Sequence, residues 1–289
     1  MVHGQCLCGA QRFRLDGELV MMHHCHCGFC RKSHGSTYAT LIGVDPDKIH
    51  WDAQGDWITY RASAGYARIF CAQCGSPLPA AIEGMPHFVP TGLLEGDFGH
   101  RPECHIFVAS KAPWFEIEDG LPGFDAYPPG IDASGFESRK PADDAAGVPG
   151  SCLCGEIRYV IDGPALVARY CHCVRCQRAR GAAHACNLVV DTKHFRWTAG
   201  EVSIREYKLP EALYFTQSFC RECGSKVPRV DADRGIAVVP MGGLDDAPPI
   251  EPEEHIWVES LAVWDQIVDD LPQHSQAPPA GATRSAPRK

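Results

Sequence analysis

The sequence predicts a mainly β protein that consists of two small tandem domains joined by a linker. The same cysteine motifs occur twice in the same order, and the apolar residues fall in short runs bounded by glycine and other turn residues. A stretch rich in proline, glycine, aspartate and alanine separates the two copies. Many short strands with turn signals favour a sheet-rich architecture over a parallel α/β fold.

The repeat defines the predicted domains. Cys6-Leu7-Cys8-Gly9 returns as Cys152-Leu153-Cys154-Gly155, and later motifs keep nearly the same offset. We predict a first domain over residues 1–125, a linker over 126–149, a second domain over 150–273 and a disordered tail over 274–289. The linker and the tail hold too few apolar residues to bury a core. We expect the two copies to pack together as an intrachain pseudo-dimer.

Short alternating runs predict the strands of each copy. The matching pairs are 11–15 with 157–161, 38–43 with 185–190, 49–51 with 195–197, and 57–60 with 203–207. The segment from His255 to Val268 alone would pass for an apolar helix, but its counterpart carries Pro113 where the second copy has Val263. Because proline disrupts a helix interior, we predict a strand here in both copies.

Composition excludes several functional classes. The net charge of −9 leaves no excess of lysine and arginine for neutralising phosphates, so we expect no nucleic-acid partner. We expect no signal peptide and no membrane span, because neither pattern is present, and we therefore expect a cytoplasmic protein. Since disulfides do not persist in a reducing cytosol, the 16 cysteines indicate metal binding or catalysis.

Two of the three cysteine motifs in each copy combine into a site for one metal ion. In an extended Cys-x-Cys pair both thiols point to the same side, and a Cys-x-x-Cys-Gly turn supplies two more. Closed sites of four thiolates are structural and often decide whether a small domain folds. We predict structural zinc sites at Cys6, Cys8, Cys71 and Cys74 and at Cys152, Cys154, Cys220 and Cys223.

The remaining motif of each copy holds three thiols, which are Cys25, Cys27 and Cys30 and their counterparts Cys171, Cys173 and Cys176. Three protein ligands leave one position of a zinc tetrahedron open, as in catalytic sites, and zinc is preferred here over iron. Water, an exogenous thiol or a histidine (His24, His26 or His34) would complete the site. Only His26 recurs, as His172, and in an extended segment it points away from its neighbours. We therefore favour an open position, with up to four zinc ions per chain.

Basic residues follow each three-cysteine motif. We expect Lys32, Arg178 and Arg180 to hold the carboxylates of an anionic substrate, with a solvated basic turn as the alternative. Cys104 and Cys186 lie outside the motifs, and we expect ordinary half-buried thiols there. His105 and His255 recur in the two copies, and we expect them in the core or behind the metal ligands.

The order Cys-x-Cys-Gly, Cys-x-Cys-x-x-Cys, Phe-Cys-x-x-Cys-Gly-Ser and Pro-x-x-His-Ile resembles the glutathione-dependent formaldehyde-activating (GFA) family in both copies. The resemblance implies a tent-like, β-rich domain with a structural zinc ion at the four cysteines and a catalytic one at the three. It also implies a carbon–sulfur lyase that acts in the direction of synthesis. Glutathione, or a similar thiol, would condense with formaldehyde, or another aldehyde, to give S-hydroxymethylglutathione or its analogue.

Two other functional classes stay open at this stage. A non-catalytic zinc module, similar to the centromere protein V domain, would bind glutathione or a partner with the same cysteines. A disulfide or methionine-sulfoxide reductase would need attacking and resolving thiols free of metal. Only Cys104 and Cys186 lie outside the predicted metal sites, which makes the reductase the weakest of the three hypotheses.

Overall fold

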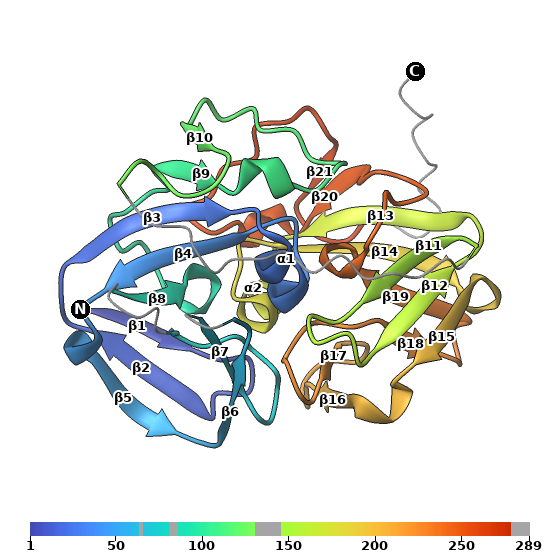
Figure 1. The fold of residues 1–289 in the computed structure, drawn as a ribbon, viewed down its shortest axis with the longest axis horizontal. Helices are drawn as coiled ribbons and strands as arrows, with labels where there is room; N and C mark the ends of the chain where they lie inside the picture. The colour runs from blue at the N-terminus through green and yellow to red at the C-terminus, as the bar shows by residue number, and fades with distance from the viewer. Residues whose placement is uncertain (64–65, 81–85, 131–145, 279–289) are drawn as a thin grey trace.

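A computed structural model describes residues 1–63, 66–80, 86–130 and 146–278. The described chain is mainly β and forms two similar sheet-rich halves, seen on the left and right of Figure 1, which confirms the predicted fold class. The central part of the predicted linker and most of the predicted tail lie outside the described residues. No helix among the described residues is long and apolar enough to cross a membrane.

The first half contains three sheets, with strand orders β1-β2-β5, β10-β9-β3-β4-β8 and β6-β7. Its strands are β1 (Val2–Gln5), β2 (Gln11–Leu15), β3 (Leu19–Cys25), β4 (Ala39–Val44), β5 (Ile49–Gln54), β6 (Trp57–Arg61), β7 (Ala67–Cys71), β8 (His87–Pro90), β9 (Cys104–Ile106) and β10 (Gly123–Phe124). Strand β3 pairs antiparallel with β4 and parallel with β9. This register places Cys25 at the end of β3, beside Ala39 and Ile106.

The second half repeats this arrangement with sheets β11-β12-β15, β18-β19-β14-β13-β20-β21 and β16-β17. Its strands are β11 (Val148–Ser151), β12 (Arg158–Ile161), β13 (Ala165–Cys171), β14 (Ala185–Asp191), β15 (Phe195–Ala199), β16 (Ile204–Lys208), β17 (Thr216–Cys220), β18 (Arg229–Asp231), β19 (Ile236–Pro240), β20 (Glu254–Ile256) and β21 (Gln273–His274). Strand β13 lies between β14 and β20, so Cys171 takes the place that Cys25 has in the first half. Strand β11 begins within the segment predicted as linker.

The four predicted pairs of strands are present, with ends that differ by a few residues. The prediction of a strand over 255–268 is wrong beyond its first residues, because β20 ends at Ile256 and a 3₁₀ turn follows at Val258–Ser260. Between them Trp257 has a φ of 61°, which interrupts the extended backbone. Phe107 does the same in the first copy, with a φ of 57°.

Two short helices were not predicted from the sequence. Helix α1 (Gly28–His34) follows Cys27, whose sulfur accepts a hydrogen bond from the Cys30 N–H. Helix α2 (Val174–Arg180) follows Cys173, which has the same extended backbone but makes no side-chain capping hydrogen bond. Each helix ends at a glycine in the left-handed conformation, Gly35 and Gly181, which is a favourable C-terminal cap. The helices turn the third cysteine of each motif back toward the first two.

The two copies are packed tightly against each other. Helix α1 contacts the 3₁₀ turn Met241–Gly243 of the second copy, and α2 contacts the turn Thr91–Leu93 of the first, near the centre of Figure 1. A Cβ atom on Gly242 would lie 2.3 Å from the Arg31 carbonyl oxygen. One on Gly92 would lie 2.3 Å from the Ala182 amide nitrogen. Glycine is therefore required where each helix meets the other copy.

Apolar side chains also cross this boundary. The cluster around Phe13 and Leu93 of the first copy includes Trp264 of the second. In return, Trp114 of the first copy belongs to the cluster around Leu188 of the second. Because each copy completes the core of the other, the pair is expected to fold as one unit.

One ion pair crosses the boundary beside each helix. The Lys32 ammonium donates to Asp245 at 2.6 Å and to the Ser151 hydroxyl and carbonyl at 2.8 Å. The Arg178 guanidinium donates to Glu95 at 2.8 Å. The two pairs occupy matching positions of the repeat, but their side chains are 11% and 7% exposed in the first pair and 28% and 45% in the second. Burial should therefore make the first pair far more sensitive to loss of one partner.

Asp245→Asn and Glu95→Gln form a matched test of this difference. We expect Asp245→Asn to lower the free energy of unfolding by about 3 kcal/mol, because the Lys32 ammonium would stay buried without an opposite charge. Glu95→Gln should lower it by about 1 kcal/mol at most, because water can solvate Arg178. Urea denaturation of the zinc-loaded variants measures both values, and equal losses would contradict the account.

Candidate metal centres

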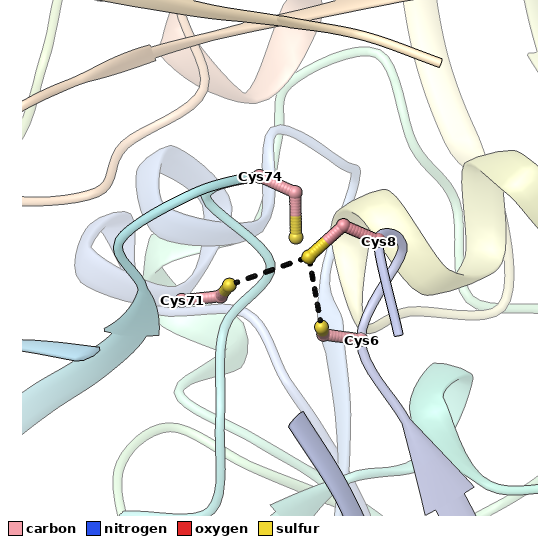
Figure 2. Close-up of side chains that lie close together, drawn as sticks. All are labelled: Cys6, Cys8, Cys71 and Cys74. Carbon is pink, nitrogen blue, oxygen red and sulfur yellow. Dashed lines mark hydrogen bonds between the residues drawn. The ribbon is translucent and has the colours of Figure 1, made fainter. Parts of the chain in front are cut away.

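Four cysteine sulfurs converge in each copy, as Figure 2 shows for Cys6, Cys8, Cys71 and Cys74. The Cys8 sulfur lies 3.5 Å from that of Cys6 and 3.7 Å from that of Cys71. The corresponding distances in the second copy, around Cys154, are 3.4 Å and 3.7 Å. Zinc–sulfur bonds of about 2.3 Å place the sulfurs of a tetrahedral site roughly 3.8 Å apart, so each set fits one zinc ion.

Backbone and hydroxyl groups close to the sulfurs support thiolate ligands. The Gln11 N–H lies 3.3 Å from the Cys6 sulfur, and the Ser76 hydroxyl lies 3.3 Å from that of Cys74. Such contacts orient metal ligands and stabilise their negative charge. Gly75, in the turn after Cys74, has a φ of 72° and packs against the Phe219 ring of the other copy. The metal-binding turn is thus part of the boundary between the copies.

Removing one thiol from a four-cysteine set should release its metal ion. We expect Cys71→Ser and Cys220→Ser each to bind one zinc ion fewer per chain and to unfold at a lower temperature. The reason is that four zinc–thiolate bonds would join the two cysteine-bearing segments of each copy. Elemental analysis and thermal unfolding provide the measurements. Cys104→Ser removes a thiol outside the clusters and is the control. A Cys71→Ser protein with full zinc content would show that the set is not a metal site.

The three-cysteine motifs form a second convergent set in each copy. Cys25 ends β3, Cys27 caps α1 and Cys30 lies in the first turn of that helix. The sulfurs of Cys25 and Cys27 are 3.6 Å apart, and those of Cys171 and Cys173 are 3.7 Å apart. These distances fit ligands of one zinc ion, with three protein sulfurs in each set.

The three histidines that the sequence offers as a fourth ligand each have another hydrogen-bond partner. His26 Nε2 lies 2.8 Å from His105 Nδ1, and His24 Nδ1 lies 2.9 Å from the Thr40 hydroxyl. His34 Nδ1 lies 2.7 Å from the carbonyl oxygen of Arg180. Each contact occupies one of the two ring nitrogens, so the open fourth position stays a prediction.

Contacts within each three-cysteine set favour negative charge on one sulfur. Hydrogen bonds from Cys25 and Cys27 lower the pKa of Cys30 well below its usual value. Hydrogen bonds from Cys171 and Cys176 lower the pKa of Cys173 to about 2. The thiolate is the form that binds zinc, so these contacts prepare the set for a metal ion.

An arginine lies near each of these sets, but at different positions of the repeat. In the first copy Arg68 of β7 donates from Nη2 to the Cys30 sulfur at 3.2 Å and lies over the Tyr66 ring. The second copy has Gln217 at that position. Its arginine is Arg180 of α2, at the position of His34 in the first copy. The sequence carried no signal for Arg68, because strand β7 brings it to the cysteines from a distant segment.

A cavity of about 330 Å³ opens beside the second three-cysteine set. Its lining includes Cys171, Cys176, Arg180 and Asn187. Arg180 Nη2 donates to Asn187 at 3.2 Å, whereas Nη1 is buried without a hydrogen-bond partner among the described residues. Nη1 packs against Gly35 of the first copy, and the Arg180 side chain as a whole borders the cavity, where its positive charge suits an anionic ligand.

The other basic residues predicted as substrate contacts lie elsewhere. Lys32 and Arg178 form the two ion pairs between the copies, with Asp245 and Glu95. Of the three, Arg180 is the one that lines the cavity beside the cysteines. Of these three residues, we therefore still expect only Arg180 to bind an anionic substrate.

The two thiols outside the motifs differ from each other. Cys104 is half-buried, as expected. Cys186 is completely buried, and its sulfur lies 3.4 Å from that of Met241. The thiol occupies a core position of β14, which explains why it is more buried than predicted.

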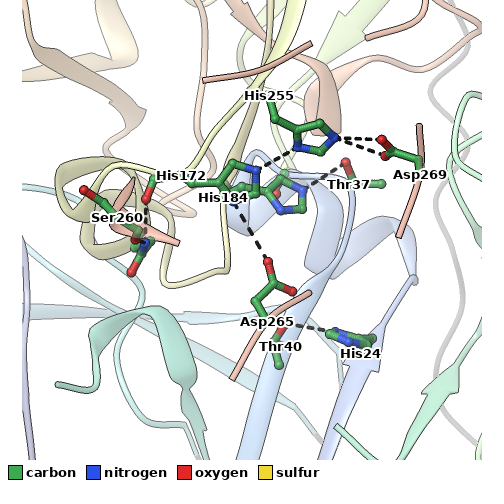
Figure 3. Close-up of polar contacts among 11 residues, drawn as sticks. His24, Thr37, Thr40, His172, His184, His255, Ser260, Asp265 and Asp269 are labelled. Atoms are coloured by element: carbon green, nitrogen blue, oxygen red, sulfur yellow. Dashed lines mark hydrogen bonds and ion pairs between the residues drawn. The ribbon is translucent and has the colours of Figure 1, made fainter. Parts of the chain in front are cut away.

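The imidazoles between the metal-binding cysteines belong to polar chains at the boundary of the copies. Figure 3 shows the chain of the second copy, in which His172 contacts His255 and His255 contacts Asp269. The first copy has the same chain from His26 through His105 to Asp119. His105 and His255 are thus buried and contact the histidine that lies between two cysteines of each motif. Such groups fix the ring orientation of a neighbouring side chain.

Comparison with known proteins identifies the family to which this chain belongs. The family model described as "Glutathione-dependent formaldehyde-activating enzyme" matches residues 1–110 and 147–260. A crystal structure of a Rhodobacter sphaeroides protein aligns with 35% of this chain and 91% of its own, at 23% sequence identity and a TM-score of 0.27. No curated protein matches the chain. From the two matched regions and their repeated cysteine sets, we conclude that the chain belongs to the GFA family and contains its domain twice.

Proposed function

We propose that the protein condenses glutathione, or a similar small thiol, with formaldehyde or another aldehyde at its three-cysteine sites. The observation that carries this proposal is the set of three convergent sulfurs with an arginine nearby in each GFA domain. A zinc ion held by three thiolates supplies a Lewis acid that lowers the pKa of a bound thiol. The two four-cysteine sets are proposed to hold structural zinc.

The proposed reaction forms one carbon–sulfur bond. The substrate thiol loses its proton, its sulfur attacks the aldehyde carbon, and the carbonyl oxygen gains a proton to become a hydroxyl group. Neither an oxidant nor a reductant is needed. Holding both reactants in one site favours the reaction through proximity.

Arginine provides the charge that this substrate requires. Three thiolates exceed the charge of one divalent ion, so an additional anionic sulfur would be repelled unless a cation is close. Arg68 contacts Cys30 directly and offsets that charge in the first copy. In the second copy, the Arg180 side chain borders the cavity, and its positive charge is suited to a carboxylate of the thiol substrate. A cavity of about 330 Å³ is within the range of sites for small molecules.

Arg68→Gln tests the role of this charge by introducing the residue of the second copy. In a Cys173→Ser background, which disables the second site, we expect glutathione to bind at least about tenfold more weakly, because a hydrogen bond to a charged group contributes about 1.5–3 kcal/mol. Zinc content should not change. Calorimetric titration measures the affinity, and Arg12→Gln, on an exposed part of β2, is the matched control. Equal affinities would contradict the proposed charge balance.

Exchange NMR tests the activity itself. The protein should accelerate exchange between free formaldehyde, glutathione and their adduct, and Cys27→Ser together with Cys173→Ser should abolish the acceleration. Each single variant then reports whether its own copy is active, and Cys104→Ser is the control. No acceleration with several thiols and aldehydes would contradict catalysis. Glutathione binding without acceleration would instead favour a non-catalytic binding module.

A further inference from the structure

We propose that His24, His105 and Asp119 form an additional site for a divalent first-row transition-metal ion, separate from the four cysteine sets. One ligand atom from each of the three side chains lies within 4.8 Å of the others. Two imidazoles and one carboxylate are a donor set that Zn²⁺ and Fe²⁺ bind, with positions left for water. This site contains no sulfur and takes no part in the proposed carbon–sulfur chemistry.

The sheet brings the two imidazoles together. Strands β3 and β9 run parallel with His24 directly opposite His105, and their ring centroids are 4.9 Å apart. Asp119 lies in the loop before β10, and its Oδ2 is 2.8 Å from His105 Nε2. Three segments of the first copy therefore contribute one ligand each. The two imidazoles lie on regular strands, which hold ligands in fixed positions, whereas the carboxylate comes from a loop.

Neighbouring groups orient both rings so that one nitrogen is left for an ion. Thr40 contacts Nδ1 of His24, and no hydrogen bond to Nε2 of that ring is seen within the described residues. His26 contacts Nδ1 of His105, whose Nε2 faces Asp119. Metal-binding histidines typically hold their second nitrogen in a hydrogen bond of this kind.

Binding of an ion changes proton positions without changing the charge of either imidazole. The ion takes the place of the proton shared by His105 Nε2 and Asp119, and His105 is then protonated at Nδ1 and donates to His26 Nε2. His26 then carries its single proton on Nδ1, which is buried without a hydrogen-bond partner among the described residues, so ion binding must offset the cost of that unpaired N–H. Ligand atoms around a tetrahedral ion with bonds of about 2.0–2.1 Å lie roughly 3.3 Å apart, so the His105–Asp119 contact needs to widen by only about half an ångström.

The surroundings favour a cation. The three side chains border or lie beside a cavity of about 230 Å³ between the copies, which has room for water ligands. Its acidic lining residues are Glu118, Asp119, Asp269 and Asp265, although burial raises the pKa of Asp265 to about 7 and reduces its charge near neutral pH. Among the described lining residues Arg101 is the single arginine or lysine. His24 and His105 are 4% and 1% exposed. A buried site with excess negative charge attracts a cation more strongly than an exposed one.

The second copy provides an internal comparison. It keeps the carboxylate–imidazole pair, with Asp269 at 3.1 Å from His255 Nε2, but has Tyr170 at the position of His24. The Tyr170 ring stacks on His255 with centroids 4.8 Å apart. The pair therefore exists without the second imidazole, and His24 is the residue that completes a metal-binding set in the first copy.

Equilibrium dialysis of the full chain against Zn²⁺, followed by elemental analysis, tests the proposal. Wild-type protein should bind one zinc ion more per chain than His24→Tyr, which introduces the residue of the second copy, and than Asp119→Asn. Asp269→Asn changes the matching carboxylate of the second copy and should bind as much zinc as the wild type. Circular dichroism confirms that the variants are folded, and either His24→Tyr or Asp119→Asn suffices if the other is unstable.

Cobalt identifies the ligands of the additional ion. When only the additional ion, at His24, His105 and Asp119, is replaced with Co²⁺, the protein should show the visible bands of nitrogen and oxygen ligation. The charge-transfer absorption of thiolate ligands should be absent. These bands should be absent from both first-copy variants. The same zinc content in wild type, His24→Tyr and Asp119→Asn would overturn the proposal, as would thiolate absorption from the additional ion. Neither result depends on catalysis, so this test is independent of the proposed enzyme activity.

Discussion

Convergence of thiolates from distant segments is the constraint on which each half of the molecule depends. Cys6 and Cys8 precede β2, whereas Cys71 ends β7 and Cys74 follows it, yet the four sulfurs meet within bonding distance of one ion. Four buried thiolates repel one another unless a cation lies among them. We therefore expect metal binding to be coupled to folding of the sheets, and the turns that carry the cysteines also pack against the other copy.

Duplication within one chain permits differences that a symmetric dimer of identical chains would not allow. The arginine near the three cysteines is Arg68 in one copy and Arg180 in the other, with Gln217 and His34 at the exchanged positions. The same exchange affects the aromatic residues at the boundary, where His24 and Tyr38 correspond to Tyr170 and His184. Each copy thus has one arginine near its three cysteines and one histidine of the His–Tyr pair at the boundary. These residues occupy different positions of the repeat in the two copies.

The partition of the cysteines could be predicted from the sequence because motif spacing and repetition are local properties. The main strands were predictable for the same reason, since alternation of apolar residues is visible in a short window. Helix α1 was not, because its seven residues span too few turns for a periodic pattern, and its start depends on the Cys27 sulfur as a cap. The segment after Ile256 was predicted wrongly because a single positive φ at Trp257 ends the strand.

Residues whose roles depend on the other copy were the hardest to predict. Lys32 stands near the three cysteines in sequence, which suggested a substrate contact, but the packing of the copies gives it Asp245 as a partner. Arg68 is far from the motif in sequence and reaches Cys30 through strand pairing. In both cases tertiary contacts, which sequence proximity does not reveal, decide what the charged group binds.

X-ray absorption at the zinc edge, with and without glutathione, tests the central claim that the three-cysteine sites accept a substrate thiol. Protein loaded at its cysteine sites alone holds two sets of four sulfurs and two of three, so the mean should be about 3.5 sulfur ligands per zinc ion. Saturation with glutathione should raise this mean to about 4, as its sulfur fills the open positions. A mean that does not change on adding the thiol would contradict the account.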